Sequence, residues 1–346
     1  MYDKFNYNDK EPNIYMRDIV LTENVQEIQA KILKELLADG RQTDSEIAEK
    51  IGVTKEIVRK NYEKMQQMGI ITGATTHINY RSFGYKAVAY ILINVYSQQQ
   101  DQLITYLKGK PEVFSIRVKG VKGSVDTVII LKTLEQLNEF KDAIKKRFSI
   151  SEMRTAIWTD VKEMNEKLTI ISGNGENVVE TSDYQPKTLK SIPQTIVADE
   201  IDQKISDKLS ENGRMPMESL AKEIGISSDT AKRRYQKLKK NGALKVTIQI
   251  NPIKIGYQAI GIFFAVISSE KSFSIIEEIS KIPDVISIMR TTGDYDLQIW
   301  VMIKNISQLL SIQEKLRNMT TITKIDMEIV RMPEKWPTPR QYISTF

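Results

Sequence analysis

The chain has 346 residues, 27% charged and 41% hydrophobic, which is the balance of a globular protein and is long enough for two or more domains. It has no cysteine, so disulfides and thiolate metal sites are excluded. A net charge of +6 and a pI of about 9.0 are compatible with an anionic partner. The polar N-terminal segment lacks the apolar core of a signal peptide, and the longest apolar run, 259–267, is too short to cross a bilayer, so we expect a cytoplasmic protein with no membrane partner.

After a tail, residues 1–24, the first half opens with three short helices. Apolar residues recur every three or four positions in 25–38, and Gly40 stands where a glycine would end this helix. A second helix is expected over 44–50, and Thr54 can cap a third. Because a tight glycine turn separates the second helix from the third, the pattern predicts a helix-turn-helix domain. We place this domain at 25–73.

The stretch 74–164 alternates strand-like and helical runs in the order strand, helix, strand, strand, helix, strand. This order predicts a ferredoxin-like domain, whose four-stranded antiparallel sheet carries both helices on one face. The other face must also be covered, and a second copy of the same sheet is the natural cover. The expected strands are 87–95, 113–118, 127–131 and 153–159, and the expected helices are 101–108 and 134–147.

The second half repeats the first. Ile51-Gly52-Val53 matches Ile224-Gly225-Ile226, 173 positions later, and Gly40-Arg41 matches Gly213-Arg214 at the same offset. The sequence therefore predicts an α+β fold with two copies of an N-terminal helix-turn-helix domain and a C-terminal ferredoxin-like βαββαβ domain. The remaining expected segments are a flexible linker at 165–193, a second helix-turn-helix domain at 194–246, a second ferredoxin-like domain at 247–333 and a tail at 334–346.

The third helix of each helix-turn-helix domain is rich in basic residues. In the second copy the stretch SSDTAKRRYQKLKKNGAL (227–244) sets six basic residues against a single acid, Asp229, whereas Glu56 and Glu63 dilute the charge in the first. A recognition helix in the major groove lies between phosphates, which basic residues neutralise. The alternative, a solvated basic helix face, stays open. Predicted DNA contacts are Ser227, Ser228, Lys232, Arg233, Arg234 and Lys237, and more weakly Thr54, Lys55, Arg59, Lys60, Asn61 and Lys64.

These segments, in this order and present twice, resemble the Lrp/AsnC, or feast/famine, transcription regulators. The resemblance rests on DQKISDKLSENGRMPMESLAKEIGISSDTAKRRYQKLKKNGAL (202–244), NPIKIGY (251–257) and TTGDYDLQI (291–299), with weaker versions in the first half. It implies a double-stranded-DNA-binding helix-turn-helix followed by a RAM-type domain that oligomerises and senses an effector such as an amino acid. The family's paired arginines map onto Arg233 and Arg234, and onto Lys60 and Asn61 in the first half, where Asn61 departs from the pattern.

The resemblance also implies an effector site near the GDYD turn. This turn maps onto Gly293, Asp294, Tyr295 and Asp296, and its first-half counterpart keeps Gly123 and Asp126. The alternative is an ordinary hairpin turn, since glycine and aspartate suit turns. Members of the family pair as dimers, so we expect either a homo-oligomer or a dimer-like unit within one chain, whose two unlike recognition helices could reach half-sites about one DNA turn apart.

Two rival functions remain. Sirohaem decarboxylases resemble this fold, can also be fused pairs, and share a histidine in the hairpin between the second and third sheet strands. The only histidine here, His77, precedes the first expected strand, and we expect it at the surface. The other rival is a metabolite sensor or scaffold with reduced DNA binding. Phosphate-binding and nucleophile motifs are absent, so we expect no enzyme activity, catalytic residues, metal site or cofactor.

Overall fold

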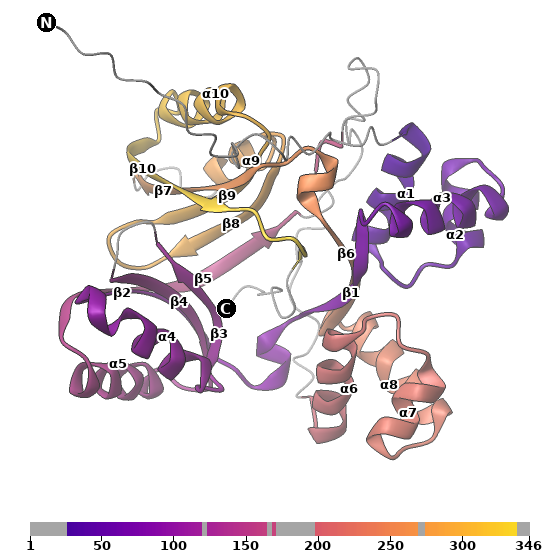
Figure 1. The fold of residues 1–346 in the computed structure, drawn as a ribbon, viewed down its shortest axis with the longest axis horizontal. Coiled ribbons are helices and arrows are strands. Elements are labelled where there is room, and N and C mark those ends of the chain that lie inside the picture. The colour runs from indigo at the N-terminus through magenta and orange to yellow at the C-terminus, as the bar shows by residue number, and fades with distance from the viewer. Residues whose placement is uncertain (1–25, 120–122, 165–167, 171–197, 269–273, 338–346) are drawn as a thin grey trace, which may run out of the picture.

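A computed structural model of the chain describes residues 26–119, 123–164, 168–170, 198–268 and 274–337. The predicted N-terminal tail and most of the predicted linker lie outside the described residues. Within the described part, no helix is both long enough and apolar enough to span a membrane. Two helix-turn-helix units occupy one side of the molecule, and a large sheet with its outer helices occupies the other (Figure 1).

Each helix-turn-helix unit has the three helices that the sequence predicts. The turn before the third helix depends on glycine, because Gly52 and Gly225 adopt left-handed conformations with φ of 73° and 76°. Thr43 begins the second helix of the first unit, where its side chain accepts a hydrogen bond from the Glu46 backbone. The helices are α1 (Glu27–Ala38), α2 (Asp44–Ile51) and α3 (Lys55–Gln67), and α6 (Glu200–Glu211), α7 (Met217–Ile224) and α8 (Ser228–Lys240).

A two-stranded ribbon that the sequence analysis missed joins the two units. Strands β1 (Ile71–Ile78) and β6 (Leu244–Ile250) pair antiparallel, so that Ile78 faces Leu244. The domain boundaries predicted at 74 and 247 fall inside these strands. His77 was expected before the first strand and at the surface; it lies instead within β1 and is buried. The β-branched runs ITGATTHI and KVTIQI carried the signal for this ribbon.

The two units pack crosswise on the ribbon. The Gly40 backbone N–H donates to the Val246 carbonyl at 2.8 Å, and that of Gly213 donates to the Ala74 carbonyl at 2.8 Å. A Cβ on Gly40 would lie 2.6 Å from the Thr247 backbone carbon. The prediction that Gly40 caps α1 was therefore wrong. Gly40 instead permits close approach of α1 to the strand of the other half.

Two arginines add further contacts between the two units. The Arg41 guanidinium donates to the Gly213 carbonyl at 2.7 Å and to the Met215 carbonyl at 3.0 Å. Arg214 returns the contact by donating to the Gly40 carbonyl at 2.7 Å and to the Gln42 carbonyl at 3.0 Å. These reciprocal hydrogen bonds join the two helix-turn-helix units into one body, as in a two-fold dimer formed by a single chain.

The ferredoxin-like halves join edge to edge. The first half orders its strands β3-β4-β2-β5, the second β8-β9-β7-β10, and pairing of β5 with β8 gives one eight-stranded sheet. The first-half elements are β2 (Ala87–Val95), α4 (Gln100–Lys108), β3 (Val113–Val118), β4 (Ser124–Leu131), α5 (Glu135–Arg147) and β5 (Ile150–Glu163). Those of the second half are β7 (Ala259–Ile267), α9 (Ser274–Ile279), β8 (Val285–Thr291), β9 (Leu297–Ile303), α10 (Ile306–Arg317) and β10 (Ile322–Arg331).

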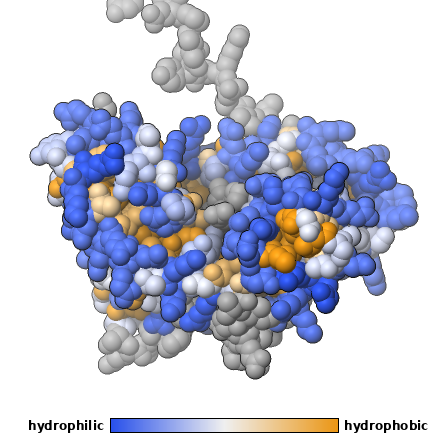
Figure 2. Space-filling model, turned by 90° about the horizontal axis from the view of Figure 1, so that it is seen from below, coloured by the Kyte–Doolittle hydropathy of each residue, from blue (hydrophilic) through white to orange (hydrophobic). Residues whose placement is uncertain are grey.

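The sheet curves so that its two halves face each other, and the helices lie outside: α4 and α5 on one half, α9 and α10 on the other (Figure 1). The hydrophobic cores also cross between halves. Ile32 and Leu36 of the first helix-turn-helix unit belong to the same core as Ile248 and Tyr257 from the second half. Seen from below, the surface is mainly hydrophilic, with hydrophobic residues gathered in a few patches (Figure 2).

Candidate nucleic-acid interface

Helix α8 is held by its buried face and by its cap. Ala231, Tyr235 and Leu238 are buried, at the spacing of one helical stripe. Ser227 caps the helix, and its hydroxyl oxygen accepts from the Thr230 backbone N–H at 3.2 Å. Ser228 begins the helix, so backbone N–H groups at this end point away from α8, as anion-binding helix termini do.

The exposed face of α8 carries cations without acidic partners. Lys232, Arg233, Lys237 and Lys240 are exposed, and no carboxylate among the described residues lies within ion-pair distance of them. Lys239 differs, because its ammonium lies 2.7 Å from an Asp39 carboxylate oxygen in the other unit. Four free positive charges on one short helix face form a surface suited to phosphates.

Arg234 has a different role from the one predicted. Its guanidinium lies 2.6 Å from an Asp199 oxygen and 2.9 Å from an Asp202 oxygen, both on the first turn of α6. Asp202 is buried. The Asp199 carboxylate accepts hydrogen bonds from the Asp202 backbone N–H and from Arg234, and these lower the pKa of Asp199. Arg234 is therefore turned onto its own domain, and its charge is already matched by two carboxylates.

Helix α3 presents less available charge. Arg59 lies 3.0 Å from the Glu63 carboxylate, and Lys55 lies 3.9 Å from Glu56. The Asn61 amide donates to the Ile57 carbonyl at 2.9 Å, so this side chain folds back on its own helix. Lys60 and Lys64 are the exposed cations of α3 for which the described residues supply no acidic partner, and the Thr54 hydroxyl is engaged in capping.

The two units differ at three matched positions. Arg234, Asp199 and Asp202 in the second unit correspond, 173 positions earlier, to Asn61, Gln26 and Gln29. Gln26 and Gln29 begin α1 with a capping box, as Asp199 and Asp202 begin α6. A charged cluster in one unit is thus a neutral amide set in the other. Asn61, which stands where the second unit has Arg234, is one of these three differences. Comparison of the two repeats in the sequence could have shown that the three positions differ together.

Three of the six predicted effector residues, Gly123, Gly293 and Asp296, have backbone roles. A Cβ on Gly123 would lie 2.1 Å from the Val95 carbonyl oxygen, and Gly293 has a φ of 108°. The Asp296 carboxylate accepts from the Ile267 backbone N–H at 2.8 Å. Asp294 and Tyr295 line a cavity of about 160 Å³, well below the size of typical ligand pockets.

Asp126 reaches a much larger space. A cavity of about 1080 Å³ lies between the two sheet halves, and Asp126 is on its wall in β4. The Arg117 guanidinium lies 2.7 Å from one Asp126 oxygen, and the Tyr90 hydroxyl donates to the other at 3.1 Å. Burial raises the pKa of the Tyr90 phenol, and the negative charge of Asp126 makes the second largest contribution in the same direction. Asp126 thus lines the large cavity, whereas Asp294 and Tyr295 line the smaller one, and the two cavities share Lys119, Arg154 and Glu328.

Three family models match this chain. The AsnC-type helix-turn-helix domain matches residues 199–239, the Lrp/AsnC ligand binding domain matches 263–333, and a winged helix-turn-helix DNA-binding model matches 26–72. The first-half sheet domain is therefore assigned by its structure, which repeats that of the second half.

Each relative aligns with a stretch of this chain about as long as one of its two modules. The HTH-type transcriptional regulator FL11 of Pyrococcus horikoshii is 30% identical over 112 residues, which is 32% of this chain and 74% of the relative. A second regulator of that organism, PH0140, is 30% identical over 146 residues, covering 42% of this chain and 92% of its own. The regulatory protein AsnC of Haemophilus influenzae is 30% identical over 116 residues, covering 33% and 77%.

A solved enzyme structure matches both modules together. The crystal structure of the siroheme decarboxylase NirDL superposes with a TM-score of 0.58 over 92% of this chain and 94% of that chain, at 15% identity. The same enzyme has been solved with an iron-uroporphyrin III analogue. At this identity the match shows a shared fold and no more.

Proposed function

The chain belongs to the Lrp/AsnC family of helix-turn-helix regulators, and on that premise we propose that it binds specific sites on double-stranded DNA and regulates transcription from them. The observation that carries this proposal is the exposed face of α8, where Lys232, Arg233, Lys237 and Lys240 have no acidic partners among the described residues. A helix of this kind enters the major groove and contacts phosphates on both walls.

The residues of α8 would divide the work. Arg233, near the middle of the helix, would read a guanine edge through two hydrogen bonds. Lys232, Lys237 and Lys240 would neutralise phosphates, and the N-terminus of α8 at Ser227 and Ser228 would bind another. Arg234 would act indirectly, by fixing α8 to the first turn of α6 through Asp199 and Asp202.

The paired construction supports binding by one chain to two adjacent half-sites. The β1–β6 ribbon and the reciprocal contacts of Arg41 and Arg214 hold both recognition helices in one body. Because α3 and α8 differ in available charge, the two half-sites would differ in affinity and the whole site need not be palindromic. Association of further chains, and an amino-acid effector at the turn of Gly293 to Asp296, stay predictions.

We further propose that the chain is not an enzyme, although its fold is shared with a siroheme decarboxylase. The only histidine in the sequence is His77, which is buried in the β1–β6 ribbon and does not line the cavity between the sheets. Histidine is the usual residue for general acid–base work near neutral pH. A stoichiometric Soret band after addition of sirohaem, with decarboxylation of it, would instead favour the enzyme.

Selection from a random duplex pool, followed by a band shift on the recovered sequence, tests the proposal. We expect a discrete shifted band that survives at physiological salt, a competitor duplex of scrambled sequence that fails to displace it, and affinity that falls steeply as salt increases. Binding that the scrambled duplex competes equally well would contradict sequence-specific recognition.

A further inference from the structure

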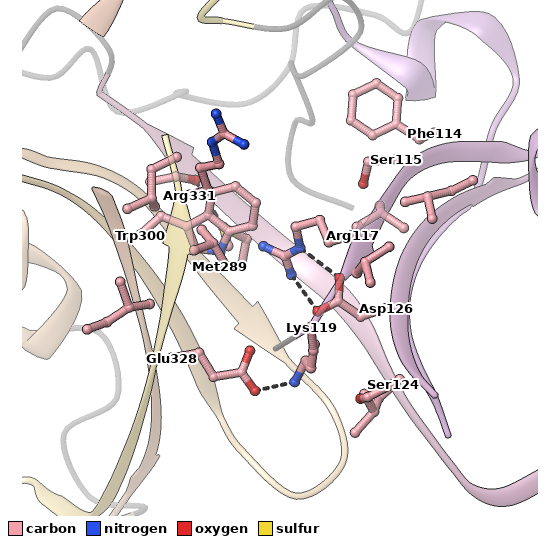
Figure 3. Close-up of a pocket in the computed structure, with 18 of the residues that line it drawn as sticks. Phe114, Ser115, Arg117, Lys119, Ser124, Asp126, Met289, Trp300, Glu328 and Arg331 are labelled. Carbon is pink, nitrogen blue, oxygen red and sulfur yellow. Dashed lines mark hydrogen bonds and ion pairs between the residues drawn. The ribbon is translucent and has the colours of Figure 1, made fainter. Parts of the chain in front are cut away.

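The cavity between the two sheet halves is built differently from an ordinary sheet interface. Sheets that pack face to face normally interdigitate apolar side chains and leave little space. Here about 1080 Å³ stays open, and polar side chains reach across it. Lys119 of the first half pairs with Glu328 of the second, and the Arg117 guanidinium carbon lies 5.0 Å from the centre of the Trp300 ring (Figure 3).

Among the described residues, the charged side chains of the cavity wall leave one cation in excess. The acids Asp126, Glu152 and Glu328 pair with Arg117, Arg154 and Lys119, respectively. Arg331 is the fourth basic residue of the wall, and the described residues place no carboxylate within ion-pair distance of it. It lies beside Trp300 in Figure 3. The wall is therefore complementary to a ligand with a single negative charge.

The uncharged part of the wall is mostly apolar and includes several aromatic side chains. All three tryptophans of the sequence, Trp158, Trp300 and Trp336, line the cavity, together with Phe114 and Met289. Tryptophan supplies large rigid surfaces that pack against planar groups at little cost in side-chain entropy. Ligand pockets commonly combine such surfaces with a few placed polar groups, and they enclose about 300–1,000 Å³.

Four buried polar atoms around the cavity have no hydrogen-bond partner among the described residues. They are the Asn94 side-chain oxygen, an Arg117 terminal nitrogen and the indole nitrogens of Trp158 and Trp300. Three of the four are donors. Leaving such groups unpaired is unfavourable, which sets this region apart from a fully satisfied interior.

We propose that this cavity binds a planar, largely apolar molecule that carries one carboxylate, with the carboxylate near Arg331 and the planar part among the tryptophans. The single excess charge disfavours a polycarboxylate, because each additional buried carboxylate would need a cation that the described residues of the wall do not supply. This inference depends on the cavity alone and not on DNA binding, so it stands or falls separately from the proposed function.

The test uses the tryptophans as reporters. We expect 8-anilino-1-naphthalenesulfonate, a monoanion with a planar naphthalene ring, to bind the full chain saturably at one site and to accept energy from excited tryptophan. 2-Naphthoate should displace this probe about tenfold more effectively than its neutral analogue 2-naphthamide, since a charged hydrogen bond contributes about 1.5–3 kcal/mol. Absence of energy transfer, or equal displacement by both compounds, would overturn the proposal.

Matched variants locate the charge. Arg331→Gln should weaken binding of 2-naphthoate in calorimetry severalfold while leaving 2-naphthamide unchanged, and Trp300→Leu should weaken both. Arg317→Gln, at an exposed arginine on α10 that does not line the cavity, should change neither. Unchanged circular dichroism confirms the fold of each variant. Tighter binding of uroporphyrin III than of 2-naphthoate would overturn the assignment to a monocarboxylate.

Discussion

The two recognition helices share a length, a cap and a buried stripe, yet they differ in the charge they present. Helix α8 has four exposed cations with no acidic partner among the described residues. Helix α3 has two such cations, and its Arg59 is ion-paired with Glu63. The difference extends to the helix behind, where Asp199 and Asp202 in one unit are Gln26 and Gln29 in the other. The two repeats therefore share a scaffold and differ in surface charge, so α8 is better suited than α3 to bind DNA.

The largest effect is expected on α8. Arg233→Ala should weaken binding to the selected duplex about 10- to 100-fold, because a bidentate arginine–guanine contact contributes about 1–3 kcal/mol. The matched change in the first unit, Lys60→Ala, should weaken binding only severalfold and reduce the salt dependence by about one counterion. Band shifts at several salt concentrations measure both. Equal losses from the two variants would remove the asymmetry.

A second prediction concerns the anchor of α8. Arg234→Met should lower the free energy of unfolding of its unit by about 1–2 kcal/mol, because buried Asp202 loses its partner. Hydrogen exchange of the α6 and α8 amides reports this locally. Asn61→Met, at the matched position of the first unit, should have little effect. The same loss of protection in α1 and α3 would contradict the difference between the units.

The anchor can also be transplanted. Replacing Arg234, Asp199 and Asp202 together by Asn, Gln and Gln copies the neutral set of the first unit. We expect this triple variant to recover most of the protection that Arg234→Met loses, since no charge is left buried and unpaired. A triple variant less protected than Arg234→Met would show that the two sets are not equivalent solutions.

A smaller change should strengthen α3. Glu63→Gln releases Arg59 from its ion pair and removes a negative charge facing DNA, so affinity should rise about threefold at low salt and less at high salt. The control is Glu139→Gln on α5, outside both helix-turn-helix units. Weaker binding by Glu63→Gln would mean that α3 does not approach the DNA.

The smallest effect is one of pH. The pKa of Asp199 is lowered in the folded chain, so the stability it contributes is present above the pKa of an unfolded aspartate, about 3.9, and is lost as pH falls through the lower folded value. Protection of α6 should therefore decrease below about pH 4. Helix α1, whose cap residue is the neutral Gln26, should lack this dependence, and hydrogen exchange corrected for intrinsic rates would show the contrast.

Much of the fold could be predicted because local patterns decide it. The glycine turns before α3 and α8 and the strand runs of both sheets were visible in the sequence. The β1–β6 ribbon was missed because its partners are far apart in the chain, although its β-branched runs were there to read. Gly40 was misread for the same reason: the sequence shows a glycine after a helix, and only the structure shows the strand that approaches it.

The candidate site was predictable in outline only. The basic character of α8 was clear, but the direction of Arg234 depends on where α6 begins, which charge counting cannot supply. The effector residues share this limit. Asp126 and Asp296 hold matching positions in the two repeats, yet only Asp126 lines the large cavity.

Hydroxyl-radical footprinting of the full chain on its selected duplex tests the central claim most directly. We predict two adjacent protected segments of unequal depth, with the deeper one lost in Arg233→Ala and the shallower one lost in Lys60→Ala. Two segments of equal depth that both variants weaken alike, or no protection at all, would contradict an asymmetric pair of recognition helices in one chain.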